Sequence, residues 1–573
     1  MAGTAPPTDG GAISAASPAA SFRGAARCAE LGKRIIAPVS IRTREACDTG
    51  VKAFSTLGPA RSSPGNEGRR VMDGSGGAGA LAQDAGDGAS ANATDRAAIA
   101  AFLEAAGATA LRPETGCTFP WPASPLGVVR PANADAAAAC VARAGAMGAP
   151  LHPISRGRSW GLGSALPPQD AIVLDLSRLD RILDLDAVHG TVRIEPGVTF
   201  SQLEAALALS GAPFHVPSFG GPPDASVLAN ALDRGEGSGA LGDRFANLWD
   251  LDVALSTGER LRTGHARRGL DRLSTLHARP AGPLLEGLLS QTSAACVLSG
   301  RLALPRTPGF AAYLACALAP AGVPAFVAAV RTLMQEDVLG VHDVFFWDGA
   351  KRLSSAAIAA DYGRGLNQPA DLRAWSASIA ISACHEMLFD CRMALALAAL
   401  TPLAESVEVF DESDDAASGL RGRSDGANLK SCYWAKPALG AAPLNPDRDR
   451  CGFLWLCPAM PLEPEALAAL AHLAQRAADA HGVFVAAGAE AVSPRALLGY
   501  VSLAWDRDEP GADARALASH DMLLDGMLDL GFGPYRLALP SRARMPTSTD
   551  DWDAVTARLR AALDPAGRFG AGR

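Results

Sequence analysis

Apolar and polar positions follow two different periodicities along this chain, and both occur in its first folded stretch. A helical pattern starts at the N-cap signal Thr94–Asp95 and continues through RAAIAAFLEAAG, and a second amphipathic helix is predicted at 200–210. Short apolar or alternating runs predict strands between and after these helices. Those strands are predicted at 171–175, 191–195, 248–255 and 295–304. The strands and helices do not alternate regularly, so the pattern indicates an α+β fold rather than a doubly wound sheet.

The residue pattern changes near Pro308, where long Ala/Leu-rich segments predict helices. AFVAAVRTLMQED and ALAALAHLAQRAADAHG are the clearest, and strands are predicted between them at 406–410 and 452–457. A last helix is predicted at 552–563. No period of 20–50 residues recurs, which excludes a solenoid.

The first 93 residues have a different composition from the rest. Leu, Ile, Val and Phe make up only 12 of them, and they contain neither Trp nor Tyr. Such a segment cannot bury a core, so a disordered extension is predicted. Two alternatives stay open: a targeting peptide, although no apolar h-region follows a charged start, and initiation at Met72.

Charge and cysteine content narrow the function classes. The chain has a net charge of −8, which argues against nucleic acid as a partner. No run of eighteen apolar residues is free of charge and proline, so a membrane span is not expected. The 11 cysteines are scattered without a CxxC pair, a pattern typical of reduced thiols in a cytoplasmic protein. The ten His include no metal-binding pair, so no metal site is predicted.

Two glycine-rich segments carry the candidate chemistry. Gly237, Gly239 and Gly242 spell GxGxxG, but a helix precedes them and a strand follows, the reverse of a Rossmann dinucleotide site. SRGRSWGLGSALP (155–167) is more informative, because its glycines let the backbone approach a ligand and its Arg and Ser residues are donors suited to a pyrophosphate. A plain surface loop is the alternative for that segment alone.

Taken together, these segments resemble the vanillyl-alcohol oxidase/p-cresol methylhydroxylase family of FAD-linked oxidoreductases. The resemblance runs from about residue 113 to 573 and rests on PISRGRSWGLGSALP, TVRIEPGVTFSQLEAAL, NALDRGEGSGALGDRF, PLLEGLLSQTSAACV and the ending ALDPAGRFGAGR. It implies a PCMH-type FAD-binding domain of two α+β subdomains with an inserted α+β cap, or substrate, domain. The implied boundaries are a disordered extension at 1–93, the FAD-binding domain at 94–308, the cap domain at 309–508 and a C-terminal segment returning to the FAD domain at 509–573.

The resemblance also assigns cofactor residues in three segments and at the chain end. The first loop would cradle the pyrophosphate, the second would contact the flavin, and a Gln-Thr pair would lie beside the isoalloxazine ring. The residues implied are Gly157, Arg158, Ser159, Gly161, Gly163, Asn230, Asp233, Arg234, Gly235, Gly242, Asp243, Gln291, Thr292 and Arg573.

The chain departs from the family pattern at the covalent flavin link. Phe453, in CGFLWLCP, stands where covalent members carry a His or Tyr, and Phe has no nucleophilic atom. The resemblance therefore implies FAD that is bound non-covalently. Leu162 stands where phenol-specific members carry a further Tyr, and Ser218 where the alcohol oxidases carry an Asp.

Tyr535 and Arg536 match the pair that binds phenolic substrates in the family. A fixed guanidinium beside a phenol O–H stabilises an oxyanion, which favours release of a hydride from the substrate to flavin N5. The implied activity is hydride removal from an aromatic alcohol, an alkylphenol or a similar small secondary metabolite. A flavin dehydrogenase that uses an electron-acceptor protein or a quinone, and a flavin-binding protein without turnover, stay open. A homodimer is implied by analogy only.

Overall fold

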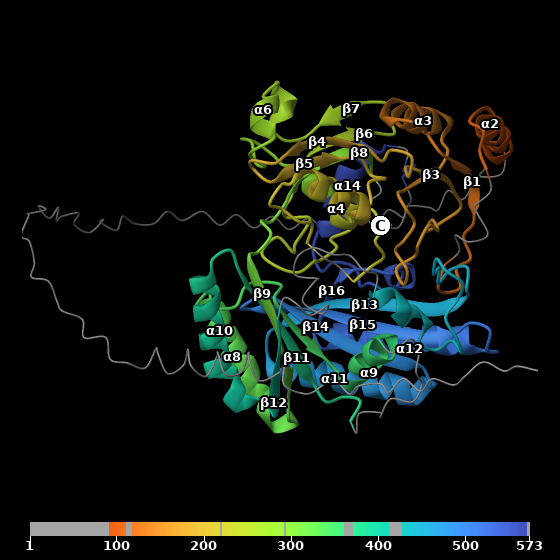
Figure 1. The fold of residues 1–573 in the computed structure, drawn as a ribbon. Helices are drawn as coiled ribbons and strands as arrows, with labels where there is room; N and C mark the ends of the chain where they lie inside the picture. Colours follow the sequence, from red (N-terminus) through yellow and green to blue (C-terminus); the bar gives the residue numbers. More distant parts are fainter. Residues whose placement is uncertain are drawn as a thin grey trace, which may run out of the picture. The chain divides into compact units, whose positions relative to one another are not determined.

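The computed structural model describes residues 91–109, 117–217, 220–291, 294–359, 371–411, 427–565 and 567–569. Residues 1–90 of the predicted N-terminal extension lie outside the described residues, as do Thr292, Ser218 and Arg573, whereas residues 91–93 begin a helix. Within residues 92–573 the chain forms two halves, visible as the upper and lower parts of Figure 1. We call them the two-sheet half (91–109, 125–304 and 552–569) and the eight-stranded half (310–536).

The two-sheet half contains one parallel and one antiparallel sheet. In the parallel sheet β3 lies between β1 and β2, and in the antiparallel sheet the order is β4-β5-β8-β6-β7. Its strands are β1 (Pro125–Val129), β2 (Leu151–Ile154), β3 (Ala171–Asp175), β4 (Ile182–Asp186), β5 (Thr191–Ile194), β6 (Leu248–Ala254), β7 (Arg260–Arg262) and β8 (Cys296–Ala303). Its helices are α2 (Ala91–Ala105), α3 (Ala134–Met147), α4 (Phe200–Ser210), α5 (Val227–Leu232), α6 (Asp271–Ser274), α7 (Glu286–Leu289) and α14 (Trp552–Leu563), with a 3₁₀ turn at His265–Arg268.

Local signals in the sequence account for the helix ends in this half. Thr199 and Gln202 form a reciprocal capping box at the start of α4, and Gly211 ends that helix in the left-handed conformation. The Asn133 side chain accepts the N–H of Ala136 at the start of α3. These caps explain why the predicted span of α4 coincides with the observed one.

The eight-stranded half is one antiparallel sheet in the order β12-β9-β11-β10-β14-β15-β13-β16. Its strands are β9 (Phe310–Ala317), β10 (Val344–Trp347), β11 (Ser376–Ala383), β12 (Ser406–Asp411), β13 (Cys451–Pro461), β14 (Phe484–Ser493), β15 (Ala496–Asp506) and β16 (Gly533–Arg536). Its helices are α8 (Val323–Gln335), α9 (Gly349–Ala359), α10 (Glu386–Leu400), α11 (Pro464–His481) and α12 (Ala512–Asp529), followed by α13 (Leu539–Arg542), with 3₁₀ turns at Pro320–Gly322, Thr401–Leu403 and Ala427–Tyr433.

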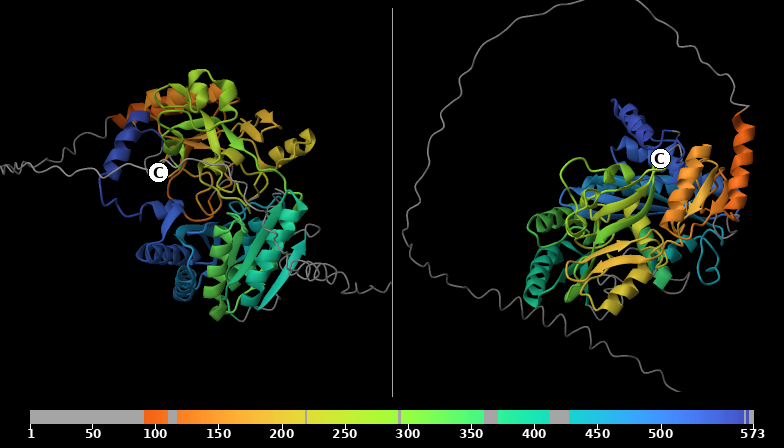
Figure 2. Two further views of the ribbon diagram at one scale, coloured as in Figure 1. Left: turned by 90° about the vertical axis from the view of Figure 1, so that its left-hand side faces the viewer. Right: turned by 90° about the horizontal axis from the view of Figure 1, so that it is seen from above.

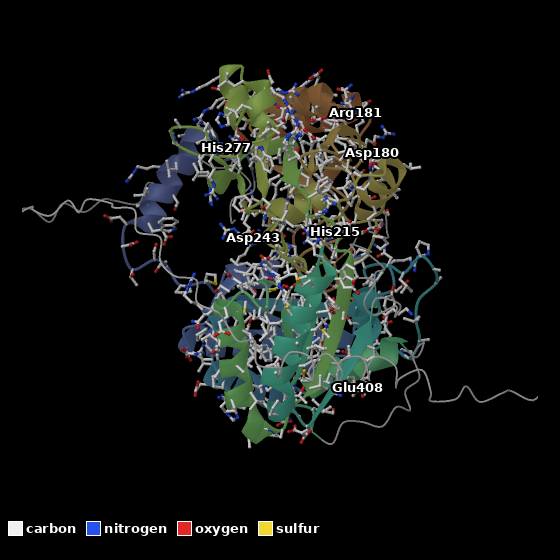
Figure 3. The ribbon with its side chains drawn as sticks, turned by 60° about the vertical axis from the view of Figure 1, so that its left-hand side comes forward. Asp180, Arg181, His215, Asp243, His277 and Glu408 are labelled. Carbon is white, nitrogen blue, oxygen red and sulfur yellow. The ribbon has the colours of Figure 1, made fainter. Side chains whose placement is uncertain are left out.

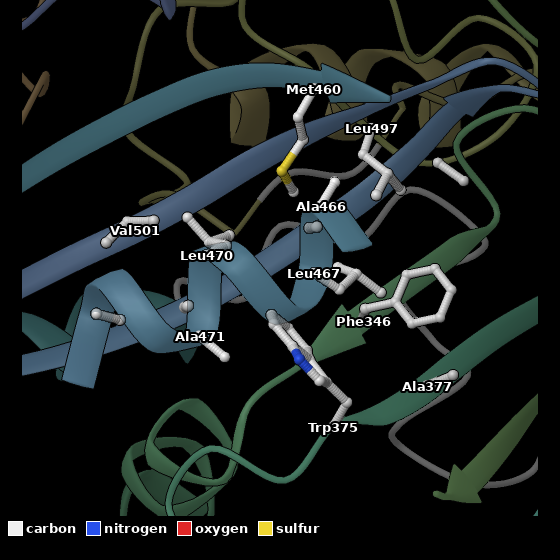
Figure 4. Packing of buried hydrophobic residues seen from close by; sticks show 14 of the residues in the cluster. Phe346, Trp375, Ala377, Met460, Ala466, Leu467, Leu470, Ala471, Leu497 and Val501 are labelled. Carbon is white, nitrogen blue, oxygen red and sulfur yellow. The ribbon is translucent and has the colours of Figure 1, made fainter. Parts of the chain in front are cut away.

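Six of these strands, all except β12 and β13, were not predicted. β9, β11, β14 and β15 are rich in Ala, which favours helices in isolation, and only their partners across the sheet make them strands. The predicted helices α8 and α11 are present. They pack their apolar stripes on the sheet, where Leu467 and Leu470 of α11 lie close to Phe346, Leu497 and Val501 (Figure 4).

The carboxyl-terminal segment divides between the halves. α12 packs against α11 and the sheet, and β16 pairs with β13, so residues 512–536 belong to the eight-stranded half. Later residues return to the two-sheet half. There Asp564 accepts the Ser256 hydroxyl at 2.6 Å, and Leu151 donates its N–H to Arg568. α14 lies by the two-sheet half in both views of Figure 2.

Residues 155–167 join the halves by extending the edge of β13. The Trp455 N–H donates to the Gly161 carbonyl at 3.0 Å, and the Leu539 N–H donates to the Leu162 carbonyl at 3.1 Å. A Cβ atom on Gly161 would lie 2.6 Å from Trp455 Cδ1 and 2.9 Å from Phe453 Cδ1. The close backbone approach therefore requires glycine at position 161.

Replacing Gly161 with alanine is expected to loosen this junction. The residue has a φ of 79°, so Gly161→Ala adds backbone strain to a steric clash and should lower the free energy of unfolding by about 1–3 kcal/mol. Gly239→Ala is the matched control, because Gly239 has a φ of 85° and a Cβ atom added there would meet no other atom within 4 Å. Thermal unfolding of both variants checks this, and equal melting temperatures would contradict the close packing.

Candidate functional site

A cavity of about 430 Å³ lies where the two halves meet. One wall comes from the two-sheet half, mainly from residues 152–164 and 220–238. The other wall is the inner face of the eight-stranded sheet. Alternation along β13 separates the two faces, because Phe453, Trp455 and Cys457 line the cavity while Leu454 and Leu456 enter the core.

Part of the first glycine-rich loop, which was predicted to cradle a pyrophosphate, lines the cavity. Gly157, Arg158 and Ser159 are among the lining residues, and Gly157 is in the left-handed region with a φ of 64°. A turn of this kind can present backbone N–H groups to an anion. Arg158 adds positive charge there and pairs with Asp224 at 2.7 Å.

Gly161 and Gly163, predicted to cradle the same phosphates, do not line the cavity. Gly161 packs against β13, and a Cβ atom on Gly163 would lie 2.8 Å from Leu539 Cγ. The structure therefore gives these two glycines a role in joining the halves. Leu162, between them, does line the cavity.

The second glycine-rich loop contributes Asn230 and Asp233 to the lining. Gly235 and Gly242 serve the packing of the loop itself. A Cβ atom on Gly235 would lie 2.0 Å from Asn230 Oδ1, and one on Gly242 would lie 2.0 Å from the Gly237 carbonyl oxygen. The absence of a side chain at both positions lets the loop fold tightly beside the cavity.

Arg234 and Asp243 are exposed and do not line the cavity. Arg234 donates from Nε to the Ser290 hydroxyl at 3.2 Å, and Asp243 accepts the N–H of Ala246 at 2.8 Å. Figure 3 shows Asp243 near the level at which the two halves meet. Their placement assigns both residues to the loop structure.

Gln291 lies at the cavity and ties the two halves together. Its Nε2 donates to the Tyr535 carbonyl at 2.7 Å, and its φ is 50°. The neighbouring Thr292 and the terminal Arg573, predicted with it, fall outside the described residues.

The Tyr535–Arg536 pair lines the cavity from β16. Arg536 Nη2 lies 2.6 Å from Asp233 Oδ2, an ion pair that crosses from one half to the other. Burial opposes the charge of Arg536, but Asp233 and Tyr535 keep its pKa above the ordinary value. Its Nε is buried and donates to none of the described residues.

A buried acidic cluster beside this pair was not predicted from the sequence. Glu490 Oε1 lies 2.9 Å from His342 Nδ1, and Glu236 Oε2 lies 3.6 Å from the same nitrogen. The Tyr500 hydroxyl donates to the other oxygen of Glu490. Glu236, Glu490 and Tyr500 line the cavity together with Tyr535.

Burial shifts the protonation of this cluster. It raises the pKa of Glu236 to about 7, although His342 opposes the shift, and it raises the pKa values of Tyr500 and Tyr535 well above the ordinary range. The pKa of His342 is also raised, because the hydrogen bond and charge of Glu490 outweigh the effect of burial. Both tyrosines are therefore O–H donors at neutral pH. Glu236 passes from the neutral acid to the carboxylate as the pH rises through about 7.

A single carboxylate inside an apolar strand, Glu490 in FVAAGAEAVS, is the sequence signal that could have revealed this cluster. Glu236 lies in the second glycine-rich loop, within DRGEGSG. Neither residue could be linked to His342 from the sequence, because the three come together only through the fold.

Two other properties of the described residues bear on the site. They contain no group of three or more His, Cys, Asp or Glu side chains arranged to hold a metal ion. None of the helices in these ranges is long and apolar enough to cross a membrane.

Comparison with known proteins places this geometry in a family. Residues 125–264 match the family described as FAD binding domain. The chain is 30% identical over 482 residues to the 1'-carboxy-chondrochloren decarboxylase of Chondromyces crocatus, covering 76% of this chain and 88% of that protein. The chain belongs to the vanillyl-alcohol oxidase/p-cresol methylhydroxylase family. It is an FAD-dependent oxidoreductase.

Further members agree with this assignment. The flavoprotein subunit of the 4-cresol dehydrogenase (hydroxylating) of Pseudomonas putida is 25% identical over 402 residues, which cover 68% of this chain and 75% of that subunit. The structure of p-cresol methylhydroxylase with substrate bound superposes with a TM-score of 0.73, at 20% identity, over 84% of this chain and 96% of that one. The predicted PCMH-type α+β fold is confirmed.

The residues around the cavity fit an FAD. The loop at Gly157–Ser159 offers backbone donors and the nearby charge of Arg158 for a pyrophosphate, and the aromatic side chains of Phe453 and Trp455 offer apolar surface for a flavin ring. Phe453 is buried and packs edge-on against Trp455, with ring centroids 5.0 Å apart. It supplies no atom for a covalent bond.

We expect the flavin to be released by acid. When the purified holoprotein is precipitated with trichloroacetic acid, the absorbance near 450 nm should remain in the supernatant. Colour retained in the pellet would contradict non-covalent binding and would direct attention to another lining nucleophile, such as Cys432 or Cys457.

Proposed function

We propose that the protein oxidises a small aromatic alcohol or alkylphenol whose hydroxyl oxygen binds to Tyr535 and Arg536. The observation that carries this proposal is that Arg536 lines the cavity and that its buried Nε has no hydrogen-bond partner among the described residues. A buried guanidinium N–H without a partner costs free energy, and an anionic oxygen would satisfy it.

The lining residues supply what this reaction needs from the protein. Aromatic walls at Phe345, Trp347 and Trp455 suit a planar substrate, and Tyr535 donates its O–H beside the Arg536 charge. FAD, when bound in the cavity, is the acceptor for the hydride. The protein's own part is to hold the substrate oxygen, stabilise its negative charge and exclude water.

Glu236 is the proposed base for a substrate that is an alcohol. Its Oε2 is buried without a hydrogen-bond partner among the described residues, and a carboxylate with a pKa of about 7 can take the hydroxyl proton near neutral pH. The name of the Pseudomonas putida relative, a 4-cresol dehydrogenase, supports a phenolic substrate. The missing phenolate donor at Leu162 favours a binding mode that relies on Arg536 and Tyr535.

A second candidate reaction is oxidative decarboxylation. It is favoured by the similarity to the Chondromyces crocatus protein, which is named as a decarboxylase. In a 3-hydroxy acid, the carbinol carbon loses a hydride to the cofactor and its hydroxyl loses a proton to Glu236, which leaves a 3-oxo acid. The bond to the carboxylate carbon then breaks, CO₂ leaves, and the resulting enolate takes up a proton. Carbon dioxide released in step with flavin reduction would assign this reaction instead of simple alcohol oxidation.

The electron acceptor is tested in the same samples. Bleaching of the flavin under anaerobic conditions, followed by admission of air, separates an oxidase from a dehydrogenase that uses a protein or quinone. A protein that no phenol or hydroxy acid bleaches would support the non-catalytic alternative.

Removing the Arg536 guanidinium should slow the reduction of the flavin by the substrate. Arg536→Ala is expected to lower the rate of flavin reduction by a phenolic substrate about 10²–10³-fold, the usual effect of losing one oxyanion donor. Arg558→Ala, an exposed arginine on α14, is the control. Stopped-flow absorbance measures both variants, and an unchanged rate in Arg536→Ala would remove this residue from the site.

The acidic limb of the pH profile should depend on Glu236. Because the base must be ionised and its pKa is about 7, kcat/KM for an alcohol substrate should rise with pH through that value. Glu236→Gln should be slow and should lose this limb. If the limb persists unchanged in Glu236→Gln, another group accepts the proton.

A further inference from the structure

Lys351 is a further cation that lines the cavity, distinct from the Tyr535–Arg536 pair. It lies in the first turn of α9, lines the cavity, and is only 4% exposed. Its ammonium nitrogen lies 5.2 Å from the centroid of the Trp455 ring, which also lines the cavity. The side chain therefore ends among aromatic cavity walls.

The described residues contain no acidic group that pairs with this ammonium within 4.0 Å. The nearest acid in sequence, Asp348, is engaged elsewhere: one oxygen accepts the backbone N–H of Lys351 at 2.7 Å, and the other lies 2.5 Å from Arg373. Cys432, which shares the cavity wall, stays a neutral thiol because burial raises its pKa.

The position itself works against a positive charge. Burial lowers the pKa of Lys351, and the first turn of a helix carries the positive end of the helix dipole. The Trp455 ring compensates only in part, since a cation–π contact offsets only a fraction of the cost of burying a charge. An anion bound in the cavity would remove the remaining cost.

The other buried charges of the cavity region have partners. Arg536 pairs with Asp233, and His342 lies between Glu490 and Glu236. Lys351 is thus a cation for which the protein provides no counter-ion among the described residues, in a cavity that receives a ligand.

We propose that Lys351 binds a carboxylate carried by the substrate, so that the enzyme prefers an acidic aromatic compound to its neutral analogue. This inference rests on the proposed function of the cavity. Lys351 would be a second binding group for the substrate, in addition to Arg536. Arg536 lies opposite Cys457 in the pairing of β16 with β13. Cys457 and Trp455 are two residues apart on β13, so their backbone positions are roughly 7 Å apart along the strand. An aromatic acid with a short side chain has its two polar ends separated on this length scale.

A carboxylate suits this position better than a phosphate. A single ammonium donor matches one negative charge. Phe345 and Trp347, which line the same cavity, are stacked rings with centroids 5.5 Å apart, and they offer few donors to a dianion. The pyrophosphate of the cofactor has its own donors at Gly157–Ser159.

The test compares 3-hydroxy-3-(4-hydroxyphenyl)propanoate with its methyl ester on the FAD-loaded enzyme. The dissociation constant of each is measured from the perturbation of the flavin spectrum under anaerobic conditions, and the reduction rate is recorded separately. Lys351→Met should weaken binding of the acid about 10–100-fold and leave the ester nearly unchanged. Lys351→Arg should retain the preference for the acid, and Arg352→Met, an exposed neighbour on the same helix, should behave like the unmodified enzyme.

A purely structural role for Lys351 predicts the opposite signature. Loss of an uncompensated buried charge should leave the ligand-free Lys351→Met protein as stable as the parent or more so, whereas loss of a structural contact would lower its melting temperature. Equal weakening of acid and ester, failure of the acid to bind the parent enzyme, or loss of FAD from Lys351→Met would each overturn the proposal. Lys351-dependent binding of the acid without flavin reduction would uphold this site while refuting the proposed oxidation.

Discussion

Buried charge at the junction between the two halves must be neutralised, and this requirement organises the site. Arg536 and Asp233 are 303 residues apart in sequence and meet at 2.6 Å across the junction. His342 of the eight-stranded half likewise faces Glu236 of the two-sheet half. Arg536 and His342 are largely buried and would be destabilised without their partners, so these pairs favour one relative position of the halves. Among the unpaired buried polar atoms of the described residues, Arg536 Nε and Glu236 Oε2 belong to residues that line the cavity.

A simple geometric rule of the strand keeps this polar site separate from the apolar core. Successive side chains of a strand point to opposite faces, so β10 sends Phe346 to the core and Phe345 and Trp347 to the cavity. α8 and α11 cover the core face, and the two-sheet half covers the other. Without the glycine at 161 the loop could not approach β13, and the cavity would lose its closed wall.

Local signals predicted much of the two-sheet half, including α4 with its capping box and the glycine-rich loop at 155–167. The resemblance to a known family supplied the link between that loop, FAD and the Tyr535–Arg536 pair, since these segments are hundreds of residues apart. Ala-rich strands such as β14 escaped prediction because their conformation is set by neighbouring strands. Gly161 and Gly163 were predicted to let the backbone approach a phosphate. In the structure, the groups that approach them are side chains of β13 and of Leu539.

Residues that act through long-range contacts were missed for the same reason. His342 has an unusual φ of 59° and Glu490 sits within an apolar strand, and neither feature indicates the other. Lys351 resembles any helical lysine in sequence and becomes notable only when its burial is known. The site is therefore a product of the topology, and its chemistry follows from which charges the fold leaves without partners.

The central claim is that the wall at Tyr535 and Arg536 stabilises an anionic oxygen on the substrate. The most direct measurement is the pKa of a non-oxidisable phenol, 4-nitrophenol, bound to the FAD-loaded enzyme, obtained from difference spectra across a pH titration. We predict that the bound phenol ionises at a lower pH than the free compound and that Arg536→Ala removes the shift. An unshifted or raised pKa for the bound phenol would contradict the account.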